Sequence, residues 1–114
     1  MSGGQLSIQV EGYLAVQTDA APPLTVETAL AVRDIFATVN EAPHLGTVTL
    51  QLRVGSTVYC TLTIAADATV SSPLVSGFGL PALASGGLLS LDVTAVPTAT
   101  GSLPGRDLTV TIRL

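Results

Sequence analysis

Strict alternation of apolar and polar residues is the feature that most limits what this chain can fold into. Residues 47–54 (TVTLQLRV) and 57–64 (TVYCTLTI) each alternate without a break, and Gly55 and Ser56 separate them. Two alternating runs joined by a short Gly-containing turn predict a β-hairpin with one buried face. The predicted inward set of the second run is Val58, Cys60, Leu62 and Ile64, with Tyr59 facing outward.

Further alternating runs extend this pattern over most of the chain. Residues 5–11 (QLSIQVE), 88–96 (LLSLDVTAV) and 107–114 (DLTVTIRL) each place apolar side chains at every second position. Short clusters of Gly, Pro and Ser separate the runs, and none is long enough to be a domain linker. Several short strands between turn clusters predict an antiparallel β-sandwich. We therefore expect one β-sandwich domain over residues 1–114, with residues 1–11 forming an arm or an edge strand.

One segment is ambiguous from the sequence. Residues 25–40 (TVETALAVRDIFATVN) contain good helix formers, yet their apolar positions also alternate, and the inward set changes parity at Asp34. A helix and a strand thus both remain open. The β-branched residues favour two short strands, or one strand with a bulge near Asp34.

Charge is scarce, and its balance excludes several classes of partner. The chain has 114 residues, of which only 11% are charged; it contains four arginines, no lysine and eight acids, for a net charge of −4. Nucleic-acid binding requires a basic surface, and anionic membranes attract polybasic segments, so we predict neither partner. The chain also lacks the run of about 18 apolar residues that a membrane-spanning helix needs.

The predicted outward positions of the strands are mostly threonine, with fifteen threonines in all against twelve charged residues. Threonine suits strands, which is one explanation. The other is that part of this surface packs against further copies or other proteins, because a surface with few charges costs less to desolvate. We expect a homo-oligomer, and analogy with related folds suggests a trimer.

The sequence offers little catalytic chemistry. It has no nucleophile elbow, P-loop, dinucleotide fingerprint or zinc motif, and a single histidine (His44) and a single cysteine (Cys60) cannot form an ordinary zinc site. We expect Cys60 to be a buried small hydrophobe rather than a partner of His44. Asp92 and Asp107 are expected to face outward and to pair with arginine (Arg53 or Arg113) rather than to act in glycoside hydrolysis.

The acids in turns are expected to be solvated rather than metal-binding. Asp19, Asp34 and Asp67 could contribute oxygen ligands to calcium, but no calcium-loop spacing is present. We therefore predict no metal, no cofactor and no enzymatic activity.

Three residues are candidates for contact with a partner or ligand: Tyr59, His44 and Phe78. Tyr59 is the best single candidate for stacking on a sugar, although cross-strand packing is the more common use of such a residue. His44 lies in the segment NEAPHLG (40–46), where Pro43 fixes the backbone and Gly46 is expected to permit a sharp reversal before the next strand. We place His44 at the exposed end of this joint. Phe78 lies in the loop segment GFGLP.

The chain resembles a β-sandwich module of tailed-phage virion proteins over roughly residues 12–114. The similarity lies in three segments: Ile35–Val39 with Ala42, Pro43 and Gly46; Leu83–Gly86 with Leu89, Leu91, Asp92 and Val93; and Gly105 with Asp107, Leu108, Val110 and Ile112. His44 and Leu45 add bulk where the family has a small polar residue and glycine. The family has no catalytic residues to transfer.

The resemblance implies an all-β, antiparallel, jelly-roll-like β-sandwich of about eight strands. It also implies a non-enzymatic virion structural protein, made in the host cytoplasm, that serves as a tail, fibre, spike or capsid decoration component. Its partners would be further copies of itself, other virion proteins and a host-surface glycan. The alternative is a carbohydrate- or ligand-binding β-sandwich module.

Overall fold

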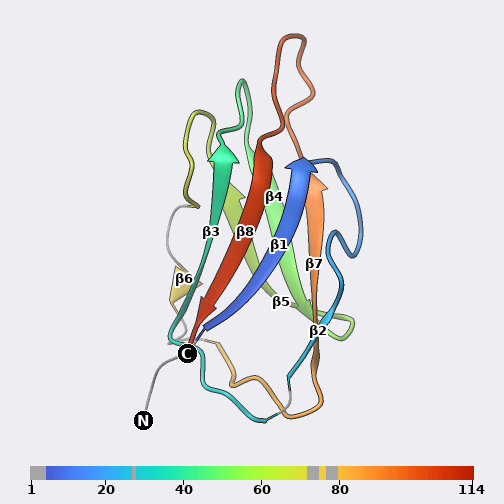
Figure 1. Ribbon diagram of the computed structural model, residues 1–114, viewed down its shortest axis with the longest axis vertical. Coiled ribbons are helices and arrows are strands. Elements are labelled where there is room, and N and C mark those ends of the chain that lie inside the picture. Colours follow the sequence, from blue (N-terminus) through green and yellow to red (C-terminus); the bar gives the residue numbers. More distant parts are fainter. Residues whose placement is uncertain (1–4, 27, 72–74, 77–79) are drawn as a thin grey trace.

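The computed structural model describes residues 5–26, 28–71, 75–76 and 80–114, and these residues form strands and no helix (Figure 1). The strands are β1 (Gln5–Tyr13), β2 (Leu24–Thr25), β3 (Asp34–Glu41), β4 (Val48–Val54), β5 (Thr57–Ile64), β6 (Val75–Ser76), β7 (Leu88–Ala95) and β8 (Arg106–Arg113). In the described part of the chain, no helix is long and apolar enough to cross a membrane.

The strand order is that of a jelly roll. One sheet has the order β1-β8-β3-β6 and the other β2-β7-β4-β5, and every pairing is antiparallel. The first strand pairs with the eighth, the second with the seventh, the third with the sixth and the fourth with the fifth. The chain is thus one long antiparallel hairpin rolled into two sheets. The predicted fold class is confirmed.

The core lies between the sheets and is built by the alternating positions. The large side chains that are fully buried include Ile35, Leu50, Leu52, Leu62, Ile64, Leu89, Leu91, Leu108 and Ile112. Both sheets contribute to this list, as a two-layer sandwich requires. Each such side chain contributes about 1.5–3 kcal/mol by leaving water, so this layer is the main source of stability.

Bulges in β5 and β7 shift the alternation, and they correct three predictions about orientation. In the β4–β5 pair, Leu52 lies opposite Cys60 but Arg53 lies opposite Val58, so Tyr59 is an extra residue. Val58 was predicted to face the core, but it lies beside Arg53 on the outer face and is 48% exposed. Tyr59 was predicted to face outward, but it is partly buried and packs against the core. A bulge inserts one residue into a strand, so the side chains on the two sides of the bulge follow opposite alternation between the inner and the outer face.

A second bulge acts on β7 in the same way. Leu50 lies opposite Val93 and Thr49 lies opposite Ala95, which leaves Thr94 as the extra residue. Ala95 continues the inward parity of the sequence, yet it is exposed.

The ambiguous segment 25–40 forms strands where it is regular. Leu24 and Thr25 form β2 in one sheet, and Asp34 begins β3 in the other; among the described residues between them, Leu30 makes a bridge to Leu83. Of the two strand alternatives, two separate strands are confirmed, and one strand with a bulge near Asp34 is wrong, because β3 pairs with β8 in unbroken register from that residue. The inward set changes parity there because the chain passes from one sheet to the other.

The connections divide between the two ends of the sandwich. The β3–β4 and β7–β8 loops lie at one end, the upper end in Figure 1, and the β7–β8 loop projects furthest. The β1–β2 connection starts at that end and runs down beside β7, to which Gln17 and Ala20 are hydrogen-bonded, and the β4–β5 turn lies toward the other end. The molecule is elongated, with extents of 46 × 23 × 21 Å.

Candidate functional site

The outer faces of both sheets carry few charges. On the β1-β8-β3-β6 sheet the central outward residues are Ser7, Gln9, Phe36, Thr38, Thr109 and Thr111. On the other sheet the outward residues are Thr49, Gln51, Arg53, Thr61, Thr63, Ser90, Asp92 and Thr94, and among them Arg53 and Asp92 form an ion pair. Isolated soluble sheets usually carry lysine and glutamate on such faces, which also discourage association between molecules. These two faces carry neither.

The charges that border these faces pair with one another. Arg113 on β8 binds Asp34 on β3 through two hydrogen bonds, Nε to Oδ1 at 2.5 Å and Nη2 to Oδ2 at 2.7 Å. The guanidinium also lies 5.2 Å from the centre of the Phe36 ring. The hydrogen bonds that Arg113 donates to Asp34 raise the pKa of Arg113. This bidentate pair fixes the β3–β8 register at the end of the sheet.

A second arginine links the β1–β2 loop to the other sheet. The Nη2 atom of Arg53 donates to Asp19 Oδ1 at 2.6 Å and to Asp92 Oδ1 at 3.0 Å. Asp92 also accepts from the backbone amide of Asp19 at 2.9 Å. Burial disfavours the charged form of Asp92, but that amide and Arg53 outweigh it and hold its pKa below the ordinary value. The predicted pairing of Asp92 with Arg53 is confirmed.

The third cluster lies around Arg106 at the upper end of β8. Its Nε is 3.4 Å from Glu41 Oε2 and 3.4 Å from Asp107 Oδ2, and its guanidinium lies 5.6 Å from the centre of the Tyr13 ring. Asp107 thus pairs with Arg106 and not with Arg53 or Arg113 as predicted. The remaining arginine, Arg33, lies 4.0 Å from Asp34 Oδ2. Every arginine of the chain therefore has a carboxylate near it, and the described surface presents no isolated positive charge.

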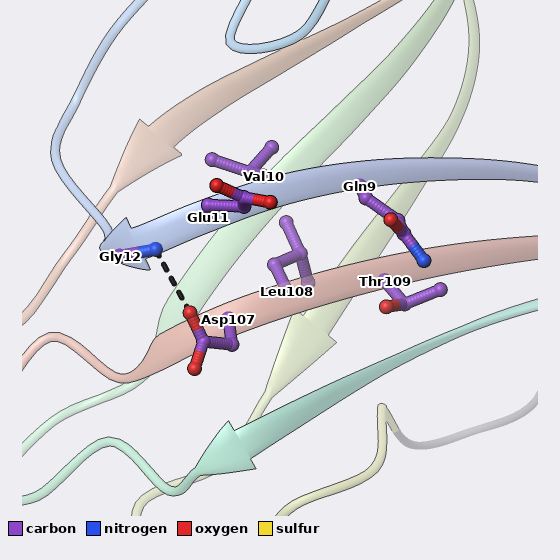
Figure 2. Close-up of a pocket in the computed structure, with 7 residues that line it drawn as sticks. All are labelled: Gln9, Val10, Glu11, Gly12, Asp107, Leu108 and Thr109. Carbon is purple, nitrogen blue, oxygen red and sulfur yellow. Dashed lines mark hydrogen bonds between the residues drawn. The ribbon is translucent and has the colours of Figure 1, made fainter.

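A groove lies on the outer side of β1 and β8 where the two strands separate (Figure 2). It has a volume of about 490 Å³ and is lined by Gln9, Val10, Glu11, Gly12, Asp107, Leu108 and Thr109. The β1–β8 register shifts between Val10 and Tyr13, and Asp107 Oδ1 accepts a hydrogen bond from the Gly12 amide at 2.9 Å, drawn as a dashed line in Figure 2. The carboxylate of Asp107 thereby replaces part of the interrupted ladder.

This bond determines the chemistry of Asp107. The Gly12 amide lowers the pKa of Asp107, with Arg106 and Asn40 acting in the same direction. A carboxylate of lowered pKa stays ionised near neutral pH and cannot serve as the general acid that glycoside hydrolysis requires. The groove is therefore a polar surface feature whose main acid has a structural role.

The three acids that were considered as calcium ligands each bind a different side chain. Asp19 binds Arg53, Asp34 binds Arg113, and Asp67 Oδ1 lies 2.9 Å from His44 Nδ1. Among the described residues, no three His, Cys, Asp or Glu side chains come together as metal ligands would.

His44 lies in a joint of three loops, which we call the tip: residues 42–47, 65–68 and 96–105. Its backbone exchanges two hydrogen bonds with Leu103, N to O at 2.9 Å and O to N at 3.1 Å, while its ring contacts Asp67. Within residues 42–47, the residue with left-handed backbone is Leu45, at φ 60°, and not Gly46. Gly46 is needed for space instead, because a Cβ there would lie 2.9 Å from Pro97 Cβ.

The tip also presents apolar side chains to solvent. Leu45 is 53% exposed and Leu103 is 43% exposed, and both belong to loops that the His44–Leu103 bridge holds together. A bulky residue at positive φ carries a backbone cost, so Leu45 is an outlier that packing alone does not explain.

Tyr59 lines a second groove, at the lower end of the sandwich. The groove has a volume of about 290 Å³ and is lined by Val54, Thr57, Val58, Tyr59, Pro81, Ala82, Leu83 and Ala84. The Tyr59 hydroxyl donates to the carbonyl of Pro81 at 2.5 Å, so its polar end is already occupied. Burial raises the pKa of Tyr59. Phe78, the third candidate contact, lies outside the described residues.

Cys60 and His44 are not brought together. Cys60 is buried opposite Leu52 in the core, where burial raises the pKa of its thiol to about 11, whereas His44 is exposed at the tip. A thiol with this pKa is a poor nucleophile near neutral pH.

No protein-family model matches this chain. No curated protein matches it. Among solved structures, the chain is similar to the globular domain of zebrafish complement 1qA protein, with 16% identity over 98% of this chain and 95% of that chain and a TM-score of 0.42. The jelly roll is established by the strand order given above.

Proposed function

We propose that this chain is a non-enzymatic structural protein of a tailed-phage virion, a tail, fibre, spike or capsid decoration component. It works by packing against further copies of itself and against other virion proteins. The observation that carries this proposal is the small number of charges on the outer faces of both sheets, together with the carboxylate that lies near each arginine. The virion setting comes from the sequence resemblance, and the localisation follows from it.

The physical reason is the cost of desolvation. An isolated charge is expensive to remove from water, whereas threonine, serine and glutamine can exchange water for neighbouring polar groups. A side of 46 by 23 Å offers about 1,000 Å² of area, and a standard protein interface buries about 800 Å² on each partner. One long side of the molecule, its loops included, is therefore large enough for one specific contact. Repeated contacts in an assembly raise the effective concentration, so each can be weak.

The tip supports a second role for the same protein. Leu45 and Leu103 expose apolar surface at the projecting end, and Leu45 does so at a backbone cost. We infer that the tip contacts another virion protein or the host surface. Exposed apolar side chains often mark interaction sites, and strained backbone conformations are concentrated at functional sites.

Charge substitutions on the sheet faces test the packing proposal. Thr61→Lys on the edge strand β5 and Thr109→Lys on the interior strand β8 each place one charge on an outer face, and Ser56→Lys places the same charge in the exposed β4–β5 turn as a control. Sedimentation velocity over a range of concentrations is expected to show association of the wild type and of Ser56→Lys. It is expected to show weaker association of at least one face variant. Equal association of all four proteins would contradict the use of the faces.

The groove beside Tyr59 favours a second candidate function, ligand binding. Its lining is mostly apolar, and the Tyr59 hydroxyl is bonded to Pro81, so it suits a small apolar group better than a sugar ring. A glycan array and a small apolar-fragment screen distinguish these ligands. Binding that Tyr59→Ala abolishes and Tyr59→Phe retains would support the groove, and no binding in either screen would remove this candidate.

A further inference from the structure

Strand β1 has an open edge that is unusually fit for pairing. It is nine residues long and lies at the end of its sheet, where it pairs with β8 alone among the described strands. In an antiparallel strand, the N–H and C=O of one residue point to the same side, and those of the next residue point to the other side. About half of the backbone groups of β1 therefore point away from β8. Natural proteins protect such edges with lysine, proline, bulges or short strands. From Gln5 to Val10, β1 has none of these, and its register with β8 is regular.

The other edges are better protected. The edge strands β2 and β6 contain two residues each. The edge strand β5 is interrupted by the bulge at Tyr59, whose side chain is tied to Pro81. The open edge of β1 is therefore the longest regular one in the described part of the chain.

An apolar hollow lies beside the same edge. It has a volume of about 250 Å³ and is lined by Leu6, Thr25, Val26, Thr28 and Leu30. Leu6 and Leu30 are only half-buried there, whereas Ile8 and Val10, further along β1, are buried. An added strand would supply backbone bonds to β1 and an apolar side chain to cover Leu6, which is the combination that strand addition uses.

We propose that β1 pairs with β1 of a second copy, antiparallel and about a two-fold axis at Ser7. In this register Gln5 lies opposite Gln9 of the second copy, and Leu6 lies opposite its Ile8. The pairing joins two four-stranded sheets into one continuous sheet. It deepens the proposed function by naming one of the contacts through which copies pack.

The sequence of β1 favours its own copy as the occupant. Each polar, uncharged residue meets another, and each apolar residue meets another, so no like charges are opposed. Glu11, the one charge on the strand, lies beyond the paired residues. The two half-exposed Leu6 side chains become diagonal neighbours, about 7–8 Å apart on the inward face. A register centred one residue later would separate them by about four residues of strand, roughly 13 Å.

Single cysteines test the register directly in the full chain. Ser7→Cys places two thiols opposite each other across the axis, with Cα atoms about 4.5–5.5 Å apart, which is within disulfide range. Gln9→Cys is the matched control on the same strand and face, since its thiol is about 13 Å along the strand from its own copy. Under a mild oxidant we expect covalent dimers of Ser7→Cys and none of Gln9→Cys. Mixing Gln5→Cys with Gln9→Cys should give the mixed dimer.

The native thiol of Cys60 is buried in the core, so we do not expect it to form cross-links in this experiment. Equal cross-linking of Ser7→Cys and Gln9→Cys would overturn the proposed register. No cross-linking of either would overturn the β1 contact.

A charge pair gives a second, reversible test. Ser7 is exposed, so Ser7→Lys is expected to fold normally while it opposes two like charges at the axis and raises the dissociation constant about tenfold. Mixing Ser7→Lys with Ser7→Asp should restore association. If Ser7→Lys associates as the wild type does, then β1 is not the contact, but packing through the sheet faces stands. If the wild type does not associate at all, the proposed function fails with it.

Discussion

The contact between Gly46 and Pro97 gives a sharp prediction about how the tip is held together. Gly46 precedes β4, and Pro97 follows β7 in the projecting loop. A Cβ added to Gly46 would lie 2.9 Å from Pro97 Cβ, 3.1 Å from its Cγ and 3.2 Å from its Cα. Gly46 does not adopt positive φ, so alanine is compatible with its backbone and only the lack of space opposes it.

Whether Gly46→Ala lowers or raises the unfolding free energy therefore depends on Pro97. With Pro97 present, Gly46→Ala forces a rigid ring to move, and overpacking of this kind costs about 1–3 kcal/mol of unfolding free energy. Without the contact, a glycine-to-alanine change at a compatible site stabilises by about 0.4–1 kcal/mol, because the unfolded chain loses entropy. For 114 residues, 1 kcal/mol corresponds to about 4 °C in Tm, so we expect a fall of about 4–12 °C.

The assay is a double-mutant cycle by urea unfolding. Gly46→Ala is compared with wild type, and again in a Pro97→Gly background that lacks the opposing Cβ. We expect a smaller destabilisation in the second comparison than in the first, because Pro97→Gly removes the Cβ and Cγ contacts and leaves the 3.2 Å approach to the Cα of residue 97. The same destabilisation in both backgrounds would refute the reasoning, since the cost would then come from the backbone of residue 46.

Three further predictions concern the core, the ladder and the bulge. Cys60, with a pKa of about 11, is expected to react with a thiol reagent near neutral pH only as fast as the protein unfolds, which labelling kinetics in increasing urea will show. Because the Gly12 amide lowers the pKa of Asp107 in the folded state, its ionised form stabilises the fold above the unfolded pKa of about 4, and this contribution is lost as the pH falls through the lower folded pKa. Asp107→Asn should thus flatten the decline in urea midpoint between about pH 5 and pH 2, and an unchanged slope would contradict this role. Leu62→Ala is expected to cost about 2–5 kcal/mol, whereas Val58→Thr, on the outer face, should change unfolding free energy by less than about 0.5 kcal/mol; a large loss for Val58→Thr would place that side chain in the core.

The strands were predictable from the sequence because alternation reports burial of one face directly. Residues 57–64 form β5 within the predicted bounds, and the inward residues of β4, β7 and β8 are buried with few exceptions. Two exceptions, Val58 in β5 and Ala95 in β7, each adjoin a bulged residue, Tyr59 and Thr94 respectively. A bulge depends on the register between two strands, and alternation within one strand does not contain that information.

The ion pairs were partly predictable. Asp92 and Arg53 both lie at predicted outward positions, so their pairing on a sheet face could be expected, whereas the adjacency of β4 and β7 comes from the structure. The bond between Arg113 and Asp34 joins residues 79 positions apart, and only the β3–β8 register brings them together. The tip was also only partly predictable. Pro43 and Gly46 indicated a bend, but the local sequence did not show that this bend is hydrogen-bonded to the loop around Leu103.

The solution mass of the wild-type chain, measured by sedimentation equilibrium over a wide concentration range at low and high salt, tests the central claim most directly. If sheet exteriors with few charges and an open β1 edge hold copies together, the mass will rise above that of one 11.5 kDa chain with concentration, and added salt will not weaken the association. A single-chain mass at every concentration and salt would contradict the account.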